Sequence, residues 1–342
     1  MTNVSQLFRT LAPECDILMS EIPQSRATVP VITVKDFMDN AAGRFDLELI
    51  AGRAGLGNIV GEPMVHRPGL ALSGFYDHFA ASRIQVLGMA EYTFLQAMSE
   101  EKRCACFETL FACKVPCIVF PGKMEIFHSM LEIAERHHVV VFKARDLSRD
   151  FMMSAMILLE ELASPRCRIH ATMMDISGIG VLIEGKSGVG KSETALGLIK
   201  RGHALVADDL TCVRRHGINH LIATATEVER DFMEIRGIGI LNVRQIFGVG
   251  AVRREKQIDL VITLTQQSEM EHSFDRTGSA LLTREFIGVQ IPQRIVPVAP
   301  GRSLVNLAET AAQDQKLRLS GYVAVEELGK RVVELHSTEE NC

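Results

Sequence analysis

The sequence predicts an α/β protein made of two units, and three observations lead to this prediction. Short apolar runs alternate with stretches of helical period along the first half, which is typical of βαβ units and a mostly parallel sheet. The second half contains a complete phosphate-binding loop between an apolar strand and an amphipathic helix. Ser164-Pro165 ends a helical pattern, so we place the boundary between the units near residue 160, giving residues 1–160 and 161–342.

The bulk composition excludes several classes of protein. With 342 residues, 47% of them hydrophobic and 23% charged, the chain has an ordinary globular composition. A net charge of −5 offers no general attraction to nucleic-acid phosphates, so we expect no nucleic-acid partner. No apolar run approaches the length of a membrane span, and the first residues lack a signal pattern. We therefore expect a cytoplasmic protein with no membrane partner.

The eight cysteines are few and irregularly spaced, which predicts reduced thiols rather than a disulfide framework. Four of them form a local cluster: Cys104, Cys106, Cys113 and Cys117. Zinc knuckles usually pair cysteines two residues apart, and these spacings differ. We predict that the cluster consists of buried, small hydrophobic side chains on a helix and on the strand after it.

The first half shows elements but no motif with a chemical interpretation. The apolar runs predict strands at residues 29–34, 47–50, 83–88, 117–120 and 139–142. Helical patterns cover residues 91–111 and 124–136, and a last helix ends at Leu162, with Ser148 or Asp150 as its cap. The role of this half is left open.

The second half opens with a predicted hairpin. Residues 168–176 and 180–184 read as two strands joined by residues 177–179, and the second strand leads into the phosphate-binding loop. Further strands are predicted at residues 204–207, 224–228, 260–264 and 295–298. The tail from residue 304 to residue 335 has a helical pattern that breaks near Gly321.

The loop itself predicts a nucleotide or polyphosphate site. It consists of Gly185, Lys186, Ser187, Gly188, Val189, Gly190, Lys191 and Ser192. Its glycines let consecutive backbone N–H groups curl round a phosphate chain. Lys191 adds charge for the outer phosphates, the Ser192 hydroxyl can reach Mg²⁺, and the N-terminus of the next helix faces the anion.

Two adjacent carboxylates follow the next apolar strand. Asp208 and Asp209 come directly after residues 204–207, and we expect that strand to run beside the strand that precedes the loop. Neighbouring side chains on an extended chain point in opposite directions. One carboxylate then serves a metal ion while the other faces an incoming hydroxyl. The alternative is that both acids merely cap the end of a strand.

Three later segments carry candidate binding residues. The first is Met233, Glu234, Ile235, Arg236, Gly237, Ile238, Gly239, Ile240, Leu241 and Asn242. In it Glu234 offers an oxygen ligand for Mg²⁺, and Arg236 offers bidentate binding of phosphate. The second segment, residues 274–278, presents Arg276 in a turn. The third is Pro297, Val298, Ala299, Pro300, Gly301 and Arg302. Alone, either of the last two would be read as a turn with a solvated arginine.

Several nucleotide-binding classes are excluded because their other motifs are missing. The sequence has no Asn-Lys-x-Asp to read guanine and no Leu-Ser-Gly-Gly-Gln of a transporter ATPase. It also lacks the protein-kinase set of His-Arg-Asp, Asp-Phe-Gly and a strand lysine.

The remaining constellation resembles the bacterial HPr kinase/phosphorylase family, also called HPr(Ser) kinase/phosphatase. The family's order is matched by Gly-Lys-Ser-Gly-Val-Gly-Lys-Ser-Glu, Val-Ala-Asp-Asp, Met-Glu-Ile-Arg-Gly-Ile-Gly-Ile-Leu-Asn and Pro-Gly-Arg. His170, which lies 21 residues before Lys191, is similar to the family's catalytic-region histidine. The likeness is densest over residues 165–303, with a weaker echo in His-Arg-Pro-Gly-Leu-Ala-Leu-Ser-Gly-Phe at residues 66–75.

This resemblance implies a bifunctional regulator of carbon metabolism and sugar phosphotransfer. With ATP or pyrophosphate, such enzymes phosphorylate a serine of the phosphocarrier protein HPr. With inorganic phosphate, they dephosphorylate it and release pyrophosphate. The resemblance also implies a homohexamer assembled through C-terminal P-loop kinase domains whose fold resembles phosphoenolpyruvate carboxykinase.

The resemblance further implies roles for single residues. The catalytic set is His170, Lys191, Asp209 and Arg276, while Ser192 and Glu234 hold Mg²⁺ with help from Asp208. Asp209 exchanges the proton of the substrate serine, and residues 297–302 chiefly serve phosphorolysis.

The sequence departs from the family at two places. Ala299 and Ser303 stand where the usual Pro-Val-Arg-Pro-Gly-Arg-Asn has arginine and asparagine, a departure that bears on the efficiency of the reverse reaction. Lys186 stands where aspartate is frequent, but this position contributes mainly its backbone.

Two other functions are compatible with a phosphate-binding loop. The first is a small-molecule kinase or carboxykinase-like enzyme that acts on a metabolite. The second is a regulatory module that senses ATP without catalysis, and the carboxylates of Asp208 and Asp209 argue against it because sensing does not need them.

Overall fold

The computed structural model describes residues 27–266 and 282–339. Their contacts divide into two compact units, one formed by Val29–Ser164 and the other containing Thr28 and the residues from Pro165 onward. The division falls just after helix α8 (Ser148–Ala163), whose C-cap residue is Ser164. Each unit has hydrophobic clusters of its own.

The N-terminal unit contains a five-stranded sheet with the order β1-β5-β4-β3-β2. Its strands are β1 (Leu47–Ala51), β2 (Val65–His66), β3 (Ile84–Val86), β4 (Cys117–Pro121) and β5 (Val140–Ala144). Strands β2 to β5 are parallel, and β1 pairs antiparallel with β5. The predicted mostly parallel sheet is therefore confirmed.

Helices cover both faces of this sheet. Helix α3 (Val34–Ala41) and α8 pack on one face, in the same cluster as Cys117 and Val119 of β4. The other face packs against α4 (Gly69–Leu72), α5 (Met89–Gln96), α6 (Glu100–Ala112) and α7 (His128–His137). Ile118 and Phe120 point to that second face, so alternate residues of β4 fill two cores. A 3₁₀ turn, η2 (Arg53–Gly57), follows β1.

Three predictions about this unit are wrong: one strand, one undivided helix and one helix cap. Residues 29–34 form no strand, because Thr33 and Asp36 build a capping box that starts α3 at Val34. The predicted helix over residues 91–111 is two helices, since Ser99 caps a new helix, α6. Helix α8 begins after Leu147 without a side-chain cap, so neither Ser148 nor Asp150 caps it.

The C-terminal unit is built on a nine-stranded sheet with the order β13-β10-β9-β6-β7-β14-β16-β15, while β8 pairs with β6. The strands are β6 (Arg166–Ile176), β7 (Ile179–Gly185), β8 (Ala204–Ala207), β9 (Leu210–His216), β10 (His220–Ala225), β13 (Glu255–Gln257), β14 (Leu260–Gln266), β15 (Thr283–Phe286) and β16 (Val289–Val298). Strands β6 and β7 form the predicted hairpin, and β7, β14 and β16 are parallel.

Two strand predictions in this unit need correction. Strand β8 does not run beside β7, because β6 and β14 occupy the two edges of β7. The strand predicted at residues 224–228 ends at Ala225, where the hydroxyl of Thr226 bonds with Glu229 and turns the chain.

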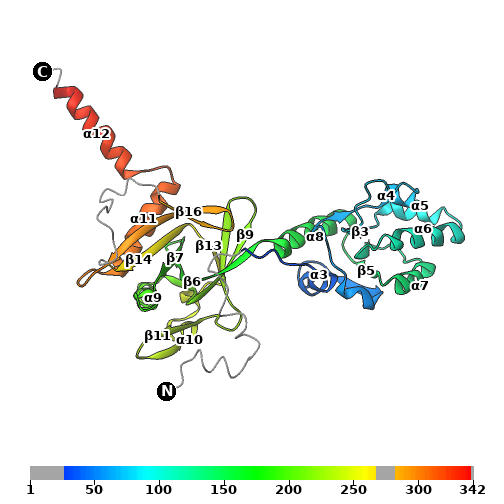
Figure 1. The fold of residues 1–342 in the computed structure, drawn as a ribbon, viewed down its shortest axis with the longest axis horizontal. Helices are drawn as coiled ribbons and strands as arrows, with labels where there is room; N and C mark the ends of the chain where they lie inside the picture. The colour runs from blue at the N-terminus through cyan, green and yellow to red at the C-terminus, as the bar shows by residue number, and fades with distance from the viewer. Residues whose placement is uncertain (1–26, 267–281, 340–342) are drawn as a thin grey trace. The chain divides into compact units, whose positions relative to one another are not determined.

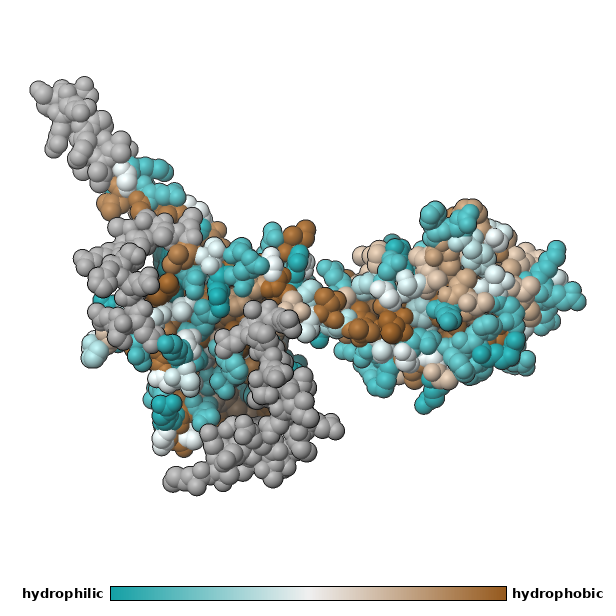
Figure 2. Space-filling view, in the orientation of Figure 1, coloured by the Kyte–Doolittle hydropathy of each residue, from teal (hydrophilic) through white to brown (hydrophobic). Residues whose placement is uncertain are grey.

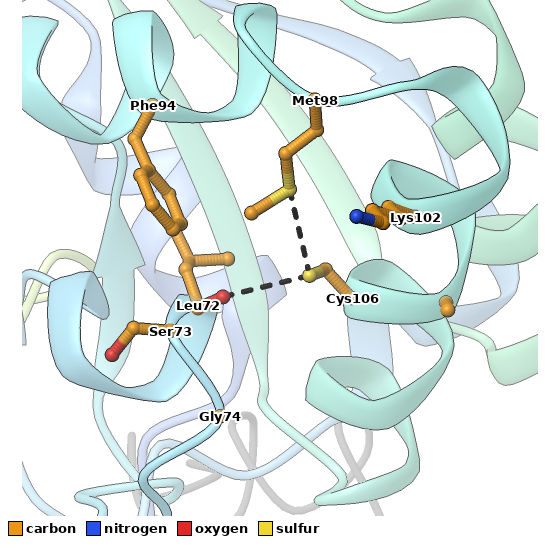
Figure 3. Close-up of a pocket in the computed structure, with 8 residues that line it drawn as sticks. Leu72, Ser73, Gly74, Phe94, Met98, Lys102 and Cys106 are labelled. Carbon is orange, nitrogen blue, oxygen red and sulfur yellow. Dashed lines mark hydrogen bonds between the residues drawn. The ribbon is translucent and has the colours of Figure 1, made fainter.

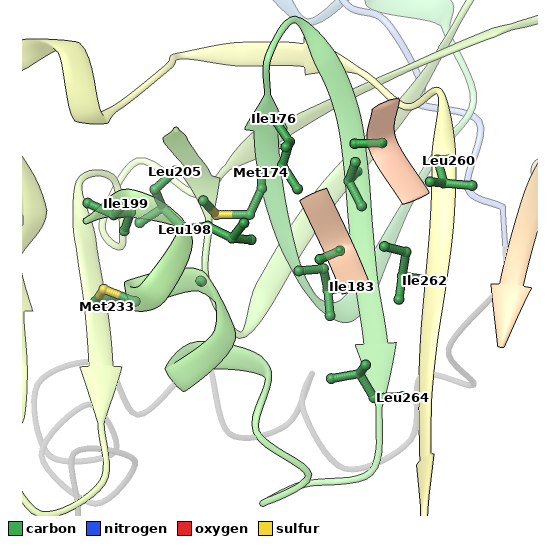
Figure 4. Packing of buried hydrophobic residues seen from close by; sticks show 14 of the residues in the cluster. Met174, Ile176, Ile183, Leu198, Ile199, Leu205, Met233, Leu260, Ile262 and Leu264 are labelled. Atoms are coloured by element: carbon green, nitrogen blue, oxygen red, sulfur yellow. The ribbon is translucent and has the colours of Figure 1, made fainter. Parts of the chain in front are cut away.

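Helices α9 (Lys191–Ile199) and α11 (Leu304–Leu319) pack over one face of the β7–β14–β16 region. Figure 4 shows Leu198 of α9 near Met174 and Ile199 of α9 near Leu205, and all four belong to one apolar cluster that also contains Ile183. The two helices approach closely, because a Cβ added to Gly197 would stand 2.5 Å from Val305 Cγ2. Helix α12 (Ala324–Glu339) follows Gly321, so the predicted break in the tail is confirmed.

A small sheet and a short helix lie beside α9. Strands β11 (Phe232–Ile235) and β12 (Gly239–Asn242) form an antiparallel hairpin, and α10 (Val243–Phe247) and η3 (Val249–Ala251) follow. Met233 and Ile235 anchor the hairpin in the cluster that packs α9.

The surface visible in Figure 2 is mostly hydrophilic, with smaller apolar areas between the polar ones. Within the residues that the structure describes, we find no helix with the length and apolar character needed to cross a membrane.

Candidate functional site

The glycine-rich loop (residues 185–192) joins the end of β7 to the start of α9 (Figure 1). Gly185, Gly188 and Gly190 have φ angles of 152°, 80° and 106°, a region that residues with a Cβ rarely adopt. A Cβ on Gly185 would also lie 2.6 Å from the carbonyl oxygen of Leu264. The loop therefore has the backbone course that lets N–H groups and the N-terminus of α9 face an anion.

Lys191 lies over the loop. Its Nζ donates to the carbonyl oxygen of Gly185 at 2.9 Å and to that of Lys186 at 3.4 Å. These are neutral acceptors, and a phosphate oxygen is a stronger partner for an ammonium group. The amine is consequently placed to turn from the loop carbonyls to a bound phosphate chain.

Asp208 is buried, with 6% of its surface exposed, and it links three elements. Its Oδ1 accepts hydrogen bonds from Thr172 Oγ1 of β6 at 2.8 Å and from Ser192 Oγ of α9 at 3.1 Å. Its Oδ2 accepts from the backbone N–H of Glu234 in β11 at 3.3 Å. Burial raises the pKa of the Asp208 carboxyl above its usual range, and these hydrogen bonds offset part of the shift.

Asp209 points the other way, and its side chain is 78% exposed. Its Oδ1 lies 3.9 Å from Nδ1 of His170. The backbone φ of 61° is left-handed, a conformation that aspartate tolerates better than most residues and that often marks functional sites. The two adjacent carboxylates thus have different surroundings: Asp208 is buried beside Ser192, and Asp209 is exposed beside His170. Capping of a strand end explains neither set of contacts.

The β11–β12 hairpin brings an arginine to the loop. A Cβ added to Gly188 would stand 3.3 Å from both terminal nitrogens of Arg236, so the Arg236 guanidinium lies against the loop at Gly188. Glu234 is exposed on the strand between two buried neighbours. In the remainder of the predicted segment, Gly237 and Gly239 have positive φ, Ile238 and Ile240 are exposed, and Leu241 is half-buried. Asn242 caps α10 by accepting from the N–H of Gln245.

The turn at residues 297–302 follows the end of β16. Pro297 and Val298 pair with the end of β14, and β14 pairs in parallel with β7, so the three strands end at one edge of the sheet. Ala299, Pro300, Gly301 and Arg302 then turn into α11, with the N–H of Arg302 donating to the carbonyl of Ala299 at 3.2 Å. Leu304 at the start of α11 lies 3.5 Å from where a Cβ on Gly190 would stand. The turn is therefore held at the loop's edge.

The remaining predicted catalytic residue, Arg276, lies outside the residues that the structure describes. Its role remains an expectation from the resemblance.

The oxygen atoms near Asp208 suit a hard divalent cation. Ser192 Oγ donates a hydrogen bond to the Asp208 carboxylate, and the backbone N–H of Glu234 donates to the same carboxylate. Hydroxyl and carboxylate oxygens, completed by phosphate and water, are the ligands that Mg²⁺ prefers. Within residues 27–266 and 282–339, no group of three or more His, Cys, Asp or Glu side chains forms a metal site by itself.

The cysteine cluster lies in the N-terminal unit, as predicted, on a helix and on the following strand. Cys104 and Cys106 belong to α6, Cys113 caps its end, and Cys117 lies in β4. Only Cys117 is buried, whereas the other three are half-buried, so the prediction of burial is wrong for them.

Two residues of the site were missed by the sequence analysis. Thr172 belongs to β6 and bonds Asp208. Glu229 is half-buried, and its pKa is raised by burial and by the nearby Asp209 and Asp208 carboxylates. The Thr226-x-x-Glu229 spacing, which resembles a capping box, is a signal that could have located it.

A hollow of about 330 Å³ lies in the N-terminal unit among α4, α5 and α6 (Figure 3). It is lined by Leu72, Ser73, Gly74, Phe94, Met98, Lys102, Ala105 and Cys106. The Cys106 thiol contacts the Leu72 carbonyl and Met98 Sδ, and Lys102 is the single charged residue of the lining. This lining offers no convergent set of catalytic groups.

The described residues form an α/β protein in which a glycine-rich loop joins strand β7 to the N-terminus of helix α9. Residues 32–159 match the family described as HPr Serine kinase N terminus, and residues 160–332 match HPr Serine kinase C-terminal domain. The chain therefore belongs to the HPr kinase/phosphorylase family.

Two relatives that are similar in sequence agree with this assignment. An HPr kinase/phosphorylase of Leptospira biflexa is 38% identical over 305 residues, which cover 89% of this chain and 94% of the relative. One of Caldanaerobacter subterraneus is 40% identical over 269 residues, covering 79% and 88%. Among solved structures, the Hpr(Ser) kinase/phosphatase from Coxiella burnetii is 34% identical, covers 47% of this chain and 97% of that chain, and gives a TM-score of 0.43.

Proposed function

We propose that this protein phosphorylates a serine of the phosphocarrier protein HPr, or of an HPr-like protein, and also reverses that modification. The phosphoryl donor is ATP or pyrophosphate, and inorganic phosphate drives the reverse reaction with release of pyrophosphate. One observation carries the proposal: in a chain of this family, Asp209 stands exposed beside His170, while its neighbour Asp208 contacts Ser192 of the loop. Such an enzyme would regulate carbon metabolism through the sugar phosphotransferase system.

Phosphoryl transfer requires mainly positioning and positive charge around the moving group. In this proposal the loop backbone surrounds the β-phosphate, and Lys191 leaves the Gly185 carbonyl to reach between the β- and γ-phosphates. Arg236, which lies against Gly188, binds phosphate oxygens from the other side. Both cations are then in place before the reaction begins.

Asp209 exchanges the proton. In the forward direction it accepts the proton of the substrate serine hydroxyl as the serine oxygen bonds to the γ-phosphorus and the bond to the nucleotide breaks. In the reverse direction an oxygen of inorganic phosphate attacks the phosphoserine phosphorus, and Asp209 returns the proton to the departing serine oxygen. His170, at 3.9 Å, orients this carboxylate.

Mg²⁺ fits the oxygen-rich surroundings of Asp208, and Ser192 and Glu234 would hold it with help from Asp208. When bound, it neutralises phosphate charge. Asp208 itself fixes the Ser192 hydroxyl and the β11 backbone relative to Thr172.

The exposed position of Asp209 supports a macromolecular acceptor. A small metabolite is usually enclosed on most of its surface, whereas the Asp209 side chain is 78% exposed. A serine on a protein surface can approach such a carboxylate directly. This observation favours HPr over the metabolite acceptor of a small-molecule kinase.

The rest of the proposal rests on the resemblance. It includes transition-state charge stabilisation by Arg276, a contribution of residues 297–302 to phosphorolysis, and a P-loop kinase fold resembling phosphoenolpyruvate carboxykinase. It also includes a cytoplasmic homohexamer.

A two-step assay tests the function. The protein is first incubated with γ-labelled ATP, Mg²⁺ and HPr, and unlabelled phosphate is added after the nucleotide has been removed. We expect label on an HPr serine in the first step and labelled pyrophosphate in the second. Turnover of ATP with a small acid or alcohol, without label on HPr, would instead identify a metabolite kinase.

A further inference from the structure

Strand β6 carries further exposed polar residues besides His170. Cys167 and Ile169 are buried, whereas Arg168 and His170 alternate with them on the exposed face. Because successive side chains of a strand point to opposite faces, Arg168 lies on the same face as His170, one step farther along. In the neighbouring strand β9, Cys212 lies opposite Arg168 and Leu210 lies opposite His170. Arg168 therefore flanks the acceptor side of Asp209.

Acidic groups lie close to this side of the site, where Asp209 is exposed beside His170. Asp208 and Asp209 both interact electrostatically with the half-buried Glu229. A serine hydroxyl is neutral and can approach these acids, but a phosphoserine brings nearly two negative charges. A phosphorylated substrate therefore needs a cation on the acceptor side.

In the proposed mechanism, the positive charges of Lys191 and Arg236 serve the phosphates of the donor instead. Lys191 lies on the loop carbonyls, and Arg236 lies against Gly188. Arg168, in contrast, is exposed on its strand, with the Cys212 thiol opposite it on β9. Burial raises the pKa of the Cys212 thiol and of the Glu229 carboxyl, and the positive charge of Arg168 offsets part of both shifts. A thiol is a weak acceptor, so a phosphate oxygen can replace it.

We propose that Arg168 binds the phosphate of the phosphorylated serine and thereby distinguishes the phosphorylated protein substrate from the unmodified one. The guanidinium fork matches two phosphate oxygens and keeps its charge at every working pH. Arg168 is a specificity-determining residue here, because the proton is handled by Asp209. This inference rests on the proposed function.

The test is equilibrium binding of HPr in its two forms to full-length protein, measured for the wild type and for Arg168→Gln. Losing a charge-assisted hydrogen bond to phosphate should raise the Kd for phosphoserine-HPr by about 10- to 100-fold. The Kd for unmodified HPr should change by less than about threefold, because its hydroxyl carries no charge. Arg168→Lys, which keeps the charge without the fork, should fall between the two.

Arg214→Gln is the matched control. Arg214 is on the same face of β9, opposite Arg166, where it pairs with Glu255 at 3.0 Å, so its loss should leave discrimination between the two forms intact. Added salt should weaken binding of phosphoserine-HPr by the wild type more than by Arg168→Gln.

Several results would overturn the inference. Equal weakening of the binding of both forms of HPr by Arg168→Gln and Arg168→Lys, or no weakening of either form, would contradict it. A raised KM for inorganic phosphate with unchanged binding of phosphoserine-HPr would place the anion elsewhere. If the wild type transfers phosphate to HPr yet the variants still discriminate normally, Arg168 loses its role while the proposed function stands. Absence of transfer by the wild type would reject both.

Discussion

Asp208 and Asp209 are adjacent, yet their surroundings differ in nearly every respect. The sequence predicted that they diverge, because neighbouring side chains on an extended chain do so. It did not predict the three donors that hold Asp208, since Thr172 and the Glu234 amide come from distant segments. Nor did it predict the left-handed backbone of Asp209. The different roles of two neighbouring carboxylates could be predicted from the sequence. Contacts that depend on strand pairing could not.

Lys191→Ala should abolish transfer in both directions, because the forward and reverse reactions use one phosphate site. Loss of a positioned cation at a transferring phosphoryl group lowers kcat by roughly 10²- to 10³-fold or more. Initial rates of HPr phosphorylation and of pyrophosphate release check this expectation. Lys200→Ala, at the end of the same helix, removes an exposed lysine and should leave both rates unchanged. Loss in one direction only would mean that the two reactions use different phosphate sites.

Asp208→Asn should make the fold more stable at neutral pH while lowering activity. Burial raises the pKa of Asp208 in the folded protein above its value of about 4 in the unfolded chain, so its contribution to stability decreases as pH rises above that value. The variant's Tm should exceed that of the wild type at pH 7, and the difference should shrink near pH 4. Thermal unfolding of both proteins between pH 4 and pH 7 measures this difference in Tm. A lower Tm at pH 7 would show that the three hydrogen bonds outweigh desolvation.

At the scale of elements, the sequence located most strands and helices but not all their ends or neighbours. Apolar runs identified β3, β4 and β5, because strands buried on both faces need continuous apolar sequence. They also identified β1, an edge strand that is only partly buried. The segment before α3 is apolar as well, yet a capping box starts a helix there. The pairing of β8 with β6 depends on which sheet edges are free, and no local pattern encodes that.

The packing of α9 on α11 gives a test at this scale. Alanine is the better helix former by about 1 kcal/mol, but a Cβ on Gly197 would lie 2.5 Å from Cγ2 of Val305, a stiff β-branched side chain. Gly197→Ala should therefore lower the free energy of unfolding by about 1–3 kcal/mol. Val305→Ala in the same chain should recover part of that loss. Denaturant unfolding of the single and double variants measures the coupling, and simple additivity would contradict the close contact.

At the scale of the whole molecule, the two units have separate cores. Apolar periodicity and the Ser164-Pro165 break indicated two units, and the contacts divide the chain between Ser164 and Pro165. The sequence did not indicate that Thr28 belongs with the second unit, where it pairs with Arg166 of β6. That pairing joins residues 138 positions apart, so no local signal reveals it.

Because the two units have separate cores, we expect a core substitution in one unit to lower the stability of that unit alone. Phe142 of β5 is fully buried in the N-terminal unit, and Phe142→Ala should destabilise that unit by about 3–5 kcal/mol. Calorimetry should show one lowered transition, while nucleotide binding at the loop is retained. Phe286→Ala is the matched change, since Phe286 is buried in the C-terminal unit and its loss should lower the other transition. Loss of nucleotide binding in folded Phe142→Ala would contradict independent units.

The proposed mechanism of phosphoryl transfer depends on Asp209 as the group that exchanges the serine proton. The most direct measurement is single-turnover phosphoryl transfer to HPr, and from phosphoserine-HPr to phosphate, by Asp209→Asn alongside its affinity for ATP. We predict near-normal ATP affinity, because Asp208 rather than Asp209 contacts Ser192 of the loop, together with transfer that is slower by about 10²- to 10⁴-fold in both directions. Transfer at the wild-type rate in either direction would contradict the account.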